Sequence, residues 1–158
     1  TMFTSFNKGK LHRNFMGYTT TNTKLMIGLG GSSISDSWTG FAQNEKDLDT
    51  YYARLDKNEI PVYRGHILNE EDLLIRRHIL NIMCQLQTSW NLESEKFPEL
   101  KQVLESLKEM EKDELLHING DQLVVTEKGK PFVRNICMAF DLRLKRKAPQ
   151  TQLFSMTI

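Results

Sequence analysis

The pair Asn119–Gly120 lies between two short apolar runs, Leu115–Ile118 and Leu123–Val125. Both residues of the pair tolerate a positive φ, and Asn-Gly between apolar runs is the strongest short-range signal for a β-hairpin. The pattern predicts a hairpin that turns at Asn119–Gly120. We expect it to lie inside a compact helical domain that runs from about residue 69 to residue 158.

Helical spacing of apolar residues surrounds this hairpin. One helix is predicted to begin at the N-cap Asn44 and to end near residues 57–58, and a second begins at Asn69 and runs towards Trp90. A third covers residues 99–111, and a fourth follows Thr126, with one face formed by Phe132, Ile136, Phe140 and Leu144. Helix, helix, β-hairpin, helix is the order of a winged-helix module.

A basic cluster at the end of the fourth helix raises the question of nucleic-acid binding. It consists of Arg143, Lys145, Arg146 and Lys147. Against that function, the third helix is acidic where a recognition helix would face phosphates, and the net charge of the chain is only +1. Cations are also favoured at the C-terminus of any helix. We expect no nucleic-acid site there.

The segment 24–35 carries the densest run of glycine and serine. The apolar residues 25–27 are predicted to form a short buried strand, and Gly28, Gly30 and Gly31 follow them. Glycines of this kind allow close approach of another group to the backbone, which is typical of a ligand-facing loop. However, Ser33 stands where a dinucleotide fingerprint needs its third glycine. A buried strand that ends in an ordinary turn is the alternative. Residues 36–43 are predicted to form a loop, and residues 60–68 a connector.

A second candidate binding segment covers residues 11–20. It has neither helical nor strand periodicity, yet it places Phe15, Met16 and Tyr18 beside His12 and Arg13. An irregular segment that mixes aromatic and charged groups is a candidate binding loop. A surface loop anchored by two aromatic side chains is an equal alternative.

The 158 residues suit one domain or two small pieces, and 39% of them are hydrophobic. The two cysteines, Cys84 and Cys137, have no metal-ligand spacing, so we predict buried thiols in a reducing compartment and no metal site. The sequence has no apolar run of membrane-spanning length and no signal peptide, which predicts a cytoplasmic protein. We expect a monomer whose apolar tail, residues 152–158, docks on the body.

Several segments, in this order, resemble the C-terminal part of the oxygen-independent coproporphyrinogen III oxidase family. The most specific are Leu11-His12-Arg13-Asn14-Phe15-Met16-Gly17-Tyr18-Thr19-Thr20 and Gly28-Leu29-Gly30 with Ser32-Ser33-Ile34-Ser35. The others are residues 42–44, 75–77 and 134–138, and Phe154, Ser155 and Ile158. Together they cover nearly the whole chain.

The resemblance implies a radical S-adenosylmethionine enzyme of haem biosynthesis. Such an enzyme converts two propionates of coproporphyrinogen III to vinyl groups, using S-adenosylmethionine and a [4Fe–4S] cluster held by Cys-x-x-x-Cys-x-x-Cys. This chain lacks that motif. It therefore resembles a C-terminal fragment, which we expect to bind neither cofactor and to be inactive by itself.

The implied fold is mixed and mostly α. Residues 1–43 would be the remnant of the end of a (β/α) barrel, residues 44–68 a helix and connector, and residues 69–158 a winged-helix-like C-terminal domain with a β-hairpin.

Site residues follow from the resemblance. Ile34 would pack against S-adenosylmethionine, with Gly28, Gly30 and Gly31 near it. His12, Arg13 and Tyr18 are candidates for binding substrate carboxylates, because arginine matches a carboxylate with two parallel hydrogen bonds. A free-standing winged-helix module that binds nucleic acid or another protein is the alternative function.

Overall fold

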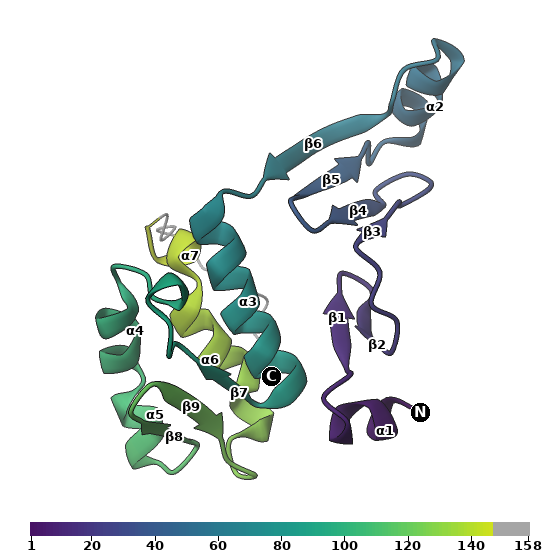
Figure 1. The fold of residues 1–158 in the computed structure, drawn as a ribbon. Coiled ribbons are helices and arrows are strands. Elements are labelled where there is room, and N and C mark those ends of the chain that lie inside the picture. The colour runs from purple at the N-terminus through teal and green to yellow at the C-terminus, as the bar shows by residue number, and fades with distance from the viewer. Residues whose placement is uncertain (147–158) are drawn as a thin grey trace. The chain divides into compact units, whose positions relative to one another are not determined.

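The computed structural model describes residues 1–146 of the chain, which form two compact units, residues 1–76 and a second that begins at Arg77 (Figure 1). It is a mixed α/β structure. The expected docking of the tail, the matches at Phe154, Ser155 and Ile158, and Lys147 of the basic cluster lie outside the described residues.

The first unit contains two antiparallel sheets. After the short helix α1 (Met2–Asn7), β1 (His12–Asn14) and β2 (Gly17–Thr19) form a two-stranded ribbon. The second sheet has the order β3-β4-β5-β6, with β3 at Leu25–Met26, β4 at Ile34–Ser37, β5 at Gly40–Asn44 and β6 at Val62–Ile67. The helix α2 (Leu48–Asp56) connects β5 to β6 (Figure 1).

Three expectations for this unit were wrong. Residues 36–43 are not a loop and residues 60–68 are not a simple connector, because β4, β5 and β6 form a meander through them. Asn44 does not cap α2. It ends β5, and the N-cap is Asp47, whose carboxylate accepts hydrogen bonds from the backbone and side chain of Thr50.

The apolar segment 25–27 is also not a buried strand. Leu25 and Ile27 are 61% and 67% exposed, because β3 is a two-residue strand at the edge of its sheet. Among the residues of this unit, Ile75 is the one buried hydrophobic side chain, whereas Asp36, Asn44, Glu45 and Asp72 are all buried. Polar contacts therefore hold this unit together.

The helix α3 (Glu70–Gln85) begins as expected at Asn69. The Asn69 side chain accepts a hydrogen bond from the Asp72 backbone, and Asp72 accepts one from the Asn69 backbone. The helix ends earlier than predicted, since Leu86 adopts φ +59° and leads into β7 (Gln87–Ser89). Its buried side chains are those of Asp72, Ile75, His78, Ile82, Met83 and Cys84.

The second unit contains the hydrophobic core. The predicted hairpin is confirmed: β8 (Leu116–Asn119) pairs with β9 (Gln122–Val125), and β7 completes a sheet of order β7-β9-β8. Asn119 pairs with Gln122, so Gly120 and Asp121 are the central turn residues, and Gly120 adopts φ +57°. His117, on β8, is exposed.

Short helices cover this sheet (Figure 1). They are η1 (Glu93–Glu95), α4 (Leu100–Ser106), α5 (Lys108–Lys112), η2 (Lys130–Phe132), α6 (Val133–Phe140) and α7 (Leu142–Arg146). The third predicted helix is thus broken in two, α4 and α5, and the fourth in three, η2, α6 and α7. Phe132, expected on the inner face, is 45% exposed, whereas Ile136 and Phe140 are fully buried with Val103, Leu107, Leu116 and Leu123.

Candidate functional site

Two cross-strand rows of side chains place the site candidate Ile34 on one face of the four-stranded sheet. Ile34 lies opposite Gln43, which lies opposite Arg64. Directly opposed residues of antiparallel strands project from the same face, and so do residues two apart along a strand. The next row, Met26, Asp36, Phe41 and His66, therefore shares that face with Ile34. We call it the Ile34 face.

Arg76 of α3 is fixed against this face. Its guanidinium donates to both carboxylate oxygens of Asp36, at 2.9 and 3.1 Å, and to the carbonyls of Ser37 and Trp38. It also lies 4.9 Å and 4.8 Å from the ring centroids of Trp38 and Phe41. Asp36 is buried, so this contact compensates a charge that burial would otherwise penalise. The neighbouring Arg77 is also paired, with Glu95 at 2.7 Å.

The Gly28–Ser33 loop beside Ile34 is held by Asn44. The Asn44 side-chain amide donates to the carbonyls of Gly28 and Gly30, at 3.2 and 3.0 Å, and to the Ser33 hydroxyl at 3.0 Å. The Ser33 hydroxyl donates to the Gly30 carbonyl at 2.7 Å, and the Tyr51 hydroxyl accepts from the Gly30 backbone. The loop therefore has a defined conformation.

The glycines of this loop serve different purposes. A Cβ on Gly28 would lie 2.7 Å from the Ile34 carbonyl oxygen, so the close approach there is to the chain's own backbone. Gly30 adopts φ +93° and a Cβ there would meet open space, while a Cβ on Gly31 would press on the Leu48 side chain. Gly30 is thus the position where the space beside the Cα is open, next to Leu29, which is 86% exposed, although the Gly30 N–H and carbonyl are already hydrogen-bonded within the loop.

The β1–β2 ribbon holds the other predicted candidates. Arg13 lies opposite Tyr18, and its guanidinium is 4.8 Å from the tyrosine ring centroid. His12 lies opposite Thr19 and projects from the other face of the ribbon, so the structure brings Arg13 and Tyr18 together without His12. At the tip of the ribbon, Phe15 packs edge-on against Phe41 with 4.9 Å between the ring centroids. The ribbon therefore contacts the Ile34 face.

The thiols and other metal-binding side chains form no metal centre among residues 1–146, where no three His, Cys, Asp or Glu side chains are grouped to hold an ion. Cys84 and Cys137 are both buried, as predicted, and form no disulfide. No helix within the described part of the chain has the length and apolar character to cross a membrane.

Sequence reasoning missed His78, which is fully buried in the second unit. Its Nδ1 lies 2.8 Å from the Thr88 hydroxyl and its Nε2 lies 2.9 Å from the Glu95 carbonyl oxygen. Burial lowers the pKa of His78, so the ring is neutral, accepting from Thr88 and donating to Glu95. The spacing of Ile75, His78 and Ile82 along one helix face was the signal that identifies it.

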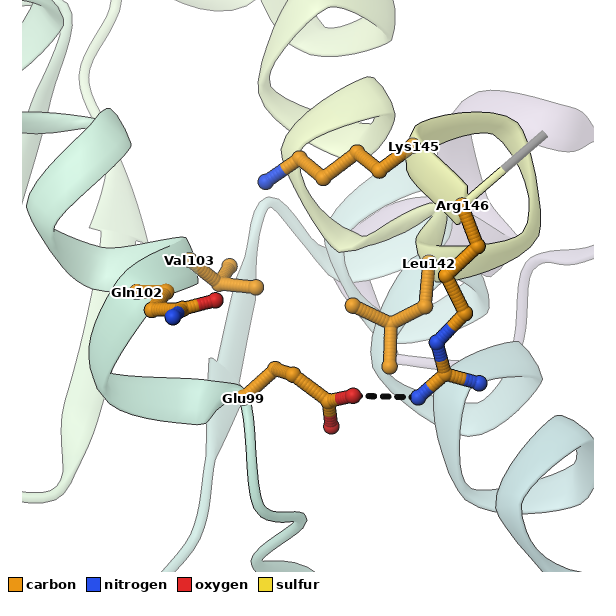
Figure 2. A pocket seen from close by; sticks show the side chains of 6 residues that line it. All are labelled: Glu99, Gln102, Val103, Leu142, Lys145 and Arg146. Carbon is orange, nitrogen blue, oxygen red and sulfur yellow. Dashed lines mark hydrogen bonds and ion pairs between the residues drawn. The ribbon is translucent and has the colours of Figure 1, made fainter. Parts of the chain in front are cut away.

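A pocket of about 210 Å³ lies between α4 and α7 in the second unit (Figure 2). Figure 2 shows the Glu99 carboxylate paired with the Arg146 guanidinium across it. The pocket is lined by Glu99, Gln102, Val103, Leu142, Lys145 and Arg146. Since none of the predicted site residues is among them, the pocket is distinct from the Ile34 face.

Comparison with known proteins identifies relatives, although no family model matches the chain. The chain is 38% identical over 160 residues to the oxygen-independent coproporphyrinogen III oxidase of Synechocystis sp., an alignment that covers 96% of this chain and 34% of that protein. It is 35% identical to the Escherichia coli enzyme of the same name, again over 96% of this chain and 34% of the relative.

A solved structure agrees with these alignments. The Escherichia coli coproporphyrinogen III oxidase HemN, described as a radical SAM enzyme, superposes with a TM-score of 0.82 at 32% identity, over 90% of this chain and 34% of that one. The fold is thus that of the C-terminal region of a radical SAM enzyme. More particularly, the chain is homologous to the C-terminal third of the oxygen-independent coproporphyrinogen III oxidases, and it spans about a third of the length of the relatives it matches.

Proposed function

We propose that this chain is the C-terminal part of an oxygen-independent coproporphyrinogen III oxidase, which converts two propionates of coproporphyrinogen III to the vinyl groups of protoporphyrinogen IX. The observation that carries the proposal is the agreement of sequence and structure over nearly the same residues: 38% identity over 96% of the chain, and a TM-score of 0.82 over 90% of it. The sequence and structure comparisons therefore point to the same enzyme.

Ile34 is the residue we propose for contact with S-adenosylmethionine, a cofactor that supplies radical chemistry when bound. The arrangement of the Ile34 face fits this role. Ile34 offers an apolar side chain there, while Gly30, whose carbonyl Asn44 holds in place, has open space where a side chain would be. Gly28 and Gly31 contribute by allowing the loop to pack closely against β4 and α2.

Arg13 and Tyr18 are proposed to bind substrate propionates. The Arg13 guanidinium lies over the Tyr18 ring, which restricts its position, and its planar set of N–H donors matches a carboxylate. His12 is proposed as a third group on the same ribbon, from its opposite face.

The [4Fe–4S] cluster does not fit the donor set of this chain. A cluster needs thiolate ligands, and the two cysteines are both buried in the second unit. We therefore assign no residue of this chain to the cluster. Anaerobic reconstitution of the isolated chain with iron and sulfide is expected to give no stable brown chromophore, and a stoichiometric cluster would contradict this assignment.

The finer description of the fold is also proposed. Residues 1–43 are the end of a (β/α) barrel, and residues 69–158 belong to a winged-helix-like domain. The order α3, β7, α4, α5, β8, β9 and α6 supports the last description. Residues 44–68, expected to be a helix and connector, contain α2 and the strand β6 instead. We further propose that the protein is a cytoplasmic monomer. We also propose that it binds no nucleic acid, because Glu99 compensates the charge of Arg146 in the basic cluster.

The experiment that tests the function is an anaerobic assay of the whole enzyme with coproporphyrinogen III, S-adenosylmethionine and a reductant. Formation of protoporphyrinogen IX, abolished when the residues corresponding to this chain are deleted, is the expected result. Unchanged turnover after the deletion would contradict the proposal.

A free-standing winged-helix module is the second candidate function, favoured by the same order of elements in the second unit. It is separated from the first by a salt-dependent titration of duplex DNA. We expect no binding tighter than micromolar at physiological salt. Tighter binding that is lost on neutralising Arg143, Lys145, Arg146 and Lys147 would favour the module.

A further inference from the structure

We propose that Arg64 on β6 binds a carboxylate group of a ligand that lies on the Ile34 face. The proposal deepens the proposed function and rests on it, because that function supplies two ligands with carboxylates: S-adenosylmethionine, with one on its methionyl group, and the porphyrinogen, with its propionates. The resemblance to the family assigned no role to this arginine.

The first observation is the position of Arg64. The pairings of Ile34 with Gln43 and of Gln43 with Arg64 align the three side chains in one row across β4, β5 and β6. Directly opposed side chains lie about 5 Å apart at Cβ, so the long side chain of Arg64 starts about 10 Å from Ile34. A ligand that covers Ile34 is therefore within reach of the guanidinium.

The second observation is how Gln43 braces this arginine. The Arg64 Nε–H donates to the Gln43 side-chain carbonyl at 3.0 Å, and the Gln43 amide donates to the Ser32 carbonyl at 3.2 Å. The brace thus connects Arg64 to the glycine-rich loop. It occupies the Nε–H and leaves the paired Nη groups, the fork that matches a carboxylate, for another acceptor.

The third observation is the charge of Arg64. Arg54 and Arg76 of the same unit pair with the carboxylates of Glu45 and Asp36, whereas Arg64 is braced by a neutral amide. Within residues 1–146 Arg64 has no ion pair, and its guanidinium also lies 6.0 Å from the centroid of the Tyr63 ring. Its positive charge is therefore uncompensated and exposed on the face that we assign to the ligand.

Binding measurements on the whole enzyme test this role without relying on turnover. The variants are Arg64→Gln, which removes the charge, and Arg64→Lys, which keeps the charge but loses the planar fork. Lys57→Gln, which removes an exposed charge at the end of α2, is the matched control. Equilibrium dialysis compares S-adenosylmethionine with its decarboxylated analogue, and coproporphyrin III with its tetramethyl ester.

We expect Arg64→Gln to lower the affinity for one of the two carboxylate ligands at least tenfold, while the affinity for its decarboxylated or esterified counterpart stays the same. Arg64→Lys should have an intermediate affinity, and Lys57→Gln should bind like the wild type. A loss confined to S-adenosylmethionine assigns the methionyl carboxylate, and a loss confined to coproporphyrin III assigns a propionate. If the wild-type enzyme is active, two results would overturn the proposal: an equal loss of affinity for each ligand and for its analogue without the carboxylate, or no loss of affinity at all. An inactive wild-type enzyme would instead overturn the proposed function, and this inference with it.

Discussion

The Asn44 side-chain amide satisfies two backbone carbonyls and a hydroxyl of the Gly28–Ser33 loop. Replacing it by Asp keeps the shape but removes both N–H donors, and places a carboxylate oxygen against the carbonyls of Gly28 and Gly30. The expected cost to the loop is about 1–3 kcal/mol. Amide hydrogen exchange of Gly28, Gly30 and Ser32 should accelerate by roughly 5- to 100-fold.

The control for this prediction is Asn91→Asp, a change of the same type at an exposed position of the second unit. It should leave exchange in the loop unchanged. Unaltered protection of Gly30 in Asn44→Asp would show that the loop is held by other contacts.

His78 should make the second unit sensitive to acid. Burial lowers the pKa of His78 in the folded state below its usual value of about 6.5, so below that pH the unfolded chain binds a proton that the folded chain does not. The contribution of neutral His78 to the free energy of unfolding is therefore fully present above about pH 6.5 and is lost as the pH falls. Glu95 does not contribute to the pH dependence of stability between pH 7 and pH 5. The hydrogen bond from the Leu92 backbone and the contact with Arg77 hold the pKa of Glu95 below its usual value near 4.5.

Thermal unfolding followed between pH 7 and pH 5 checks this. The wild-type melting temperature should fall, and the fall should be smaller in His78→Gln, which keeps an amide able to donate to the Glu95 carbonyl. Equal pH slopes for the two proteins would exclude His78 as the titrating group.

Asn44 and His78 show what sequence reasoning misses at single positions. Asn44 precedes acidic residues and a helical repeat, the local pattern of an N-cap, but its tertiary role in holding a distant loop prevails. His78 has the helical spacing of a core residue. The burial of a polar side chain can be predicted only when its hydrogen-bond partners are known, and here these are Thr88 and the Glu95 carbonyl.

Among the elements, the β8–β9 hairpin depends on its turn. Gly120 adopts φ +57°, a conformation that a β-branched side chain resists. Gly120→Val should therefore destabilise the second unit by roughly 1 kcal/mol or more, seen as a lower melting temperature. Gln122→Val, which places the same side chain in the adjacent strand, is the control and should change stability little. An unchanged melting temperature in Gly120→Val would contradict the observed turn.

Elements with a strong local signal could be predicted, and the others could not. The β8–β9 hairpin could be predicted from a short pattern, although its central turn residues are Gly120 and Asp121 and not Asn119 and Gly120. The helix start at Asn69, with its reciprocal cap to Asp72, could be predicted in the same way. The strands β4, β5 and β6 could not, because Ile34–Ser37 and Val62–Ile67 mix polar, charged and glycine residues where a half-buried strand would alternate. Their pairing and the Asp36–Arg76 contact hold them instead.

At the scale of the whole molecule, the two units differ in how they are stabilised. The second has an apolar core around Ile82, Val103, Leu116 and Phe140, whereas the first buries mainly polar side chains. The resemblance to the coproporphyrinogen III oxidases predicted which enzyme the chain matches and pointed to Ile34. It did not predict that Ile34, Gln43 and Arg64 share one face, because strand register is set by tertiary pairing.

If this chain acts as proposed, the Ile34 face lines the site of the complete enzyme. Ile34→Ala should remove apolar contact worth about 1–3 kcal/mol at most, and a small shift of the ligand would lower the rate further. Ile34→Asp should cost more, because it sets an unpaired carboxylate against an apolar surface. Leu92→Asp, at a position 62% exposed in the second unit, is the control and should remain active.

The most direct measurement is turnover of coproporphyrinogen III by the whole enzyme carrying each change, at equal cluster content. The predicted order is wild type, then Ile34→Ala, then Ile34→Asp. Full activity of Ile34→Asp would contradict the account, since the glycine-rich segment would then be no more than a tight turn beside β4.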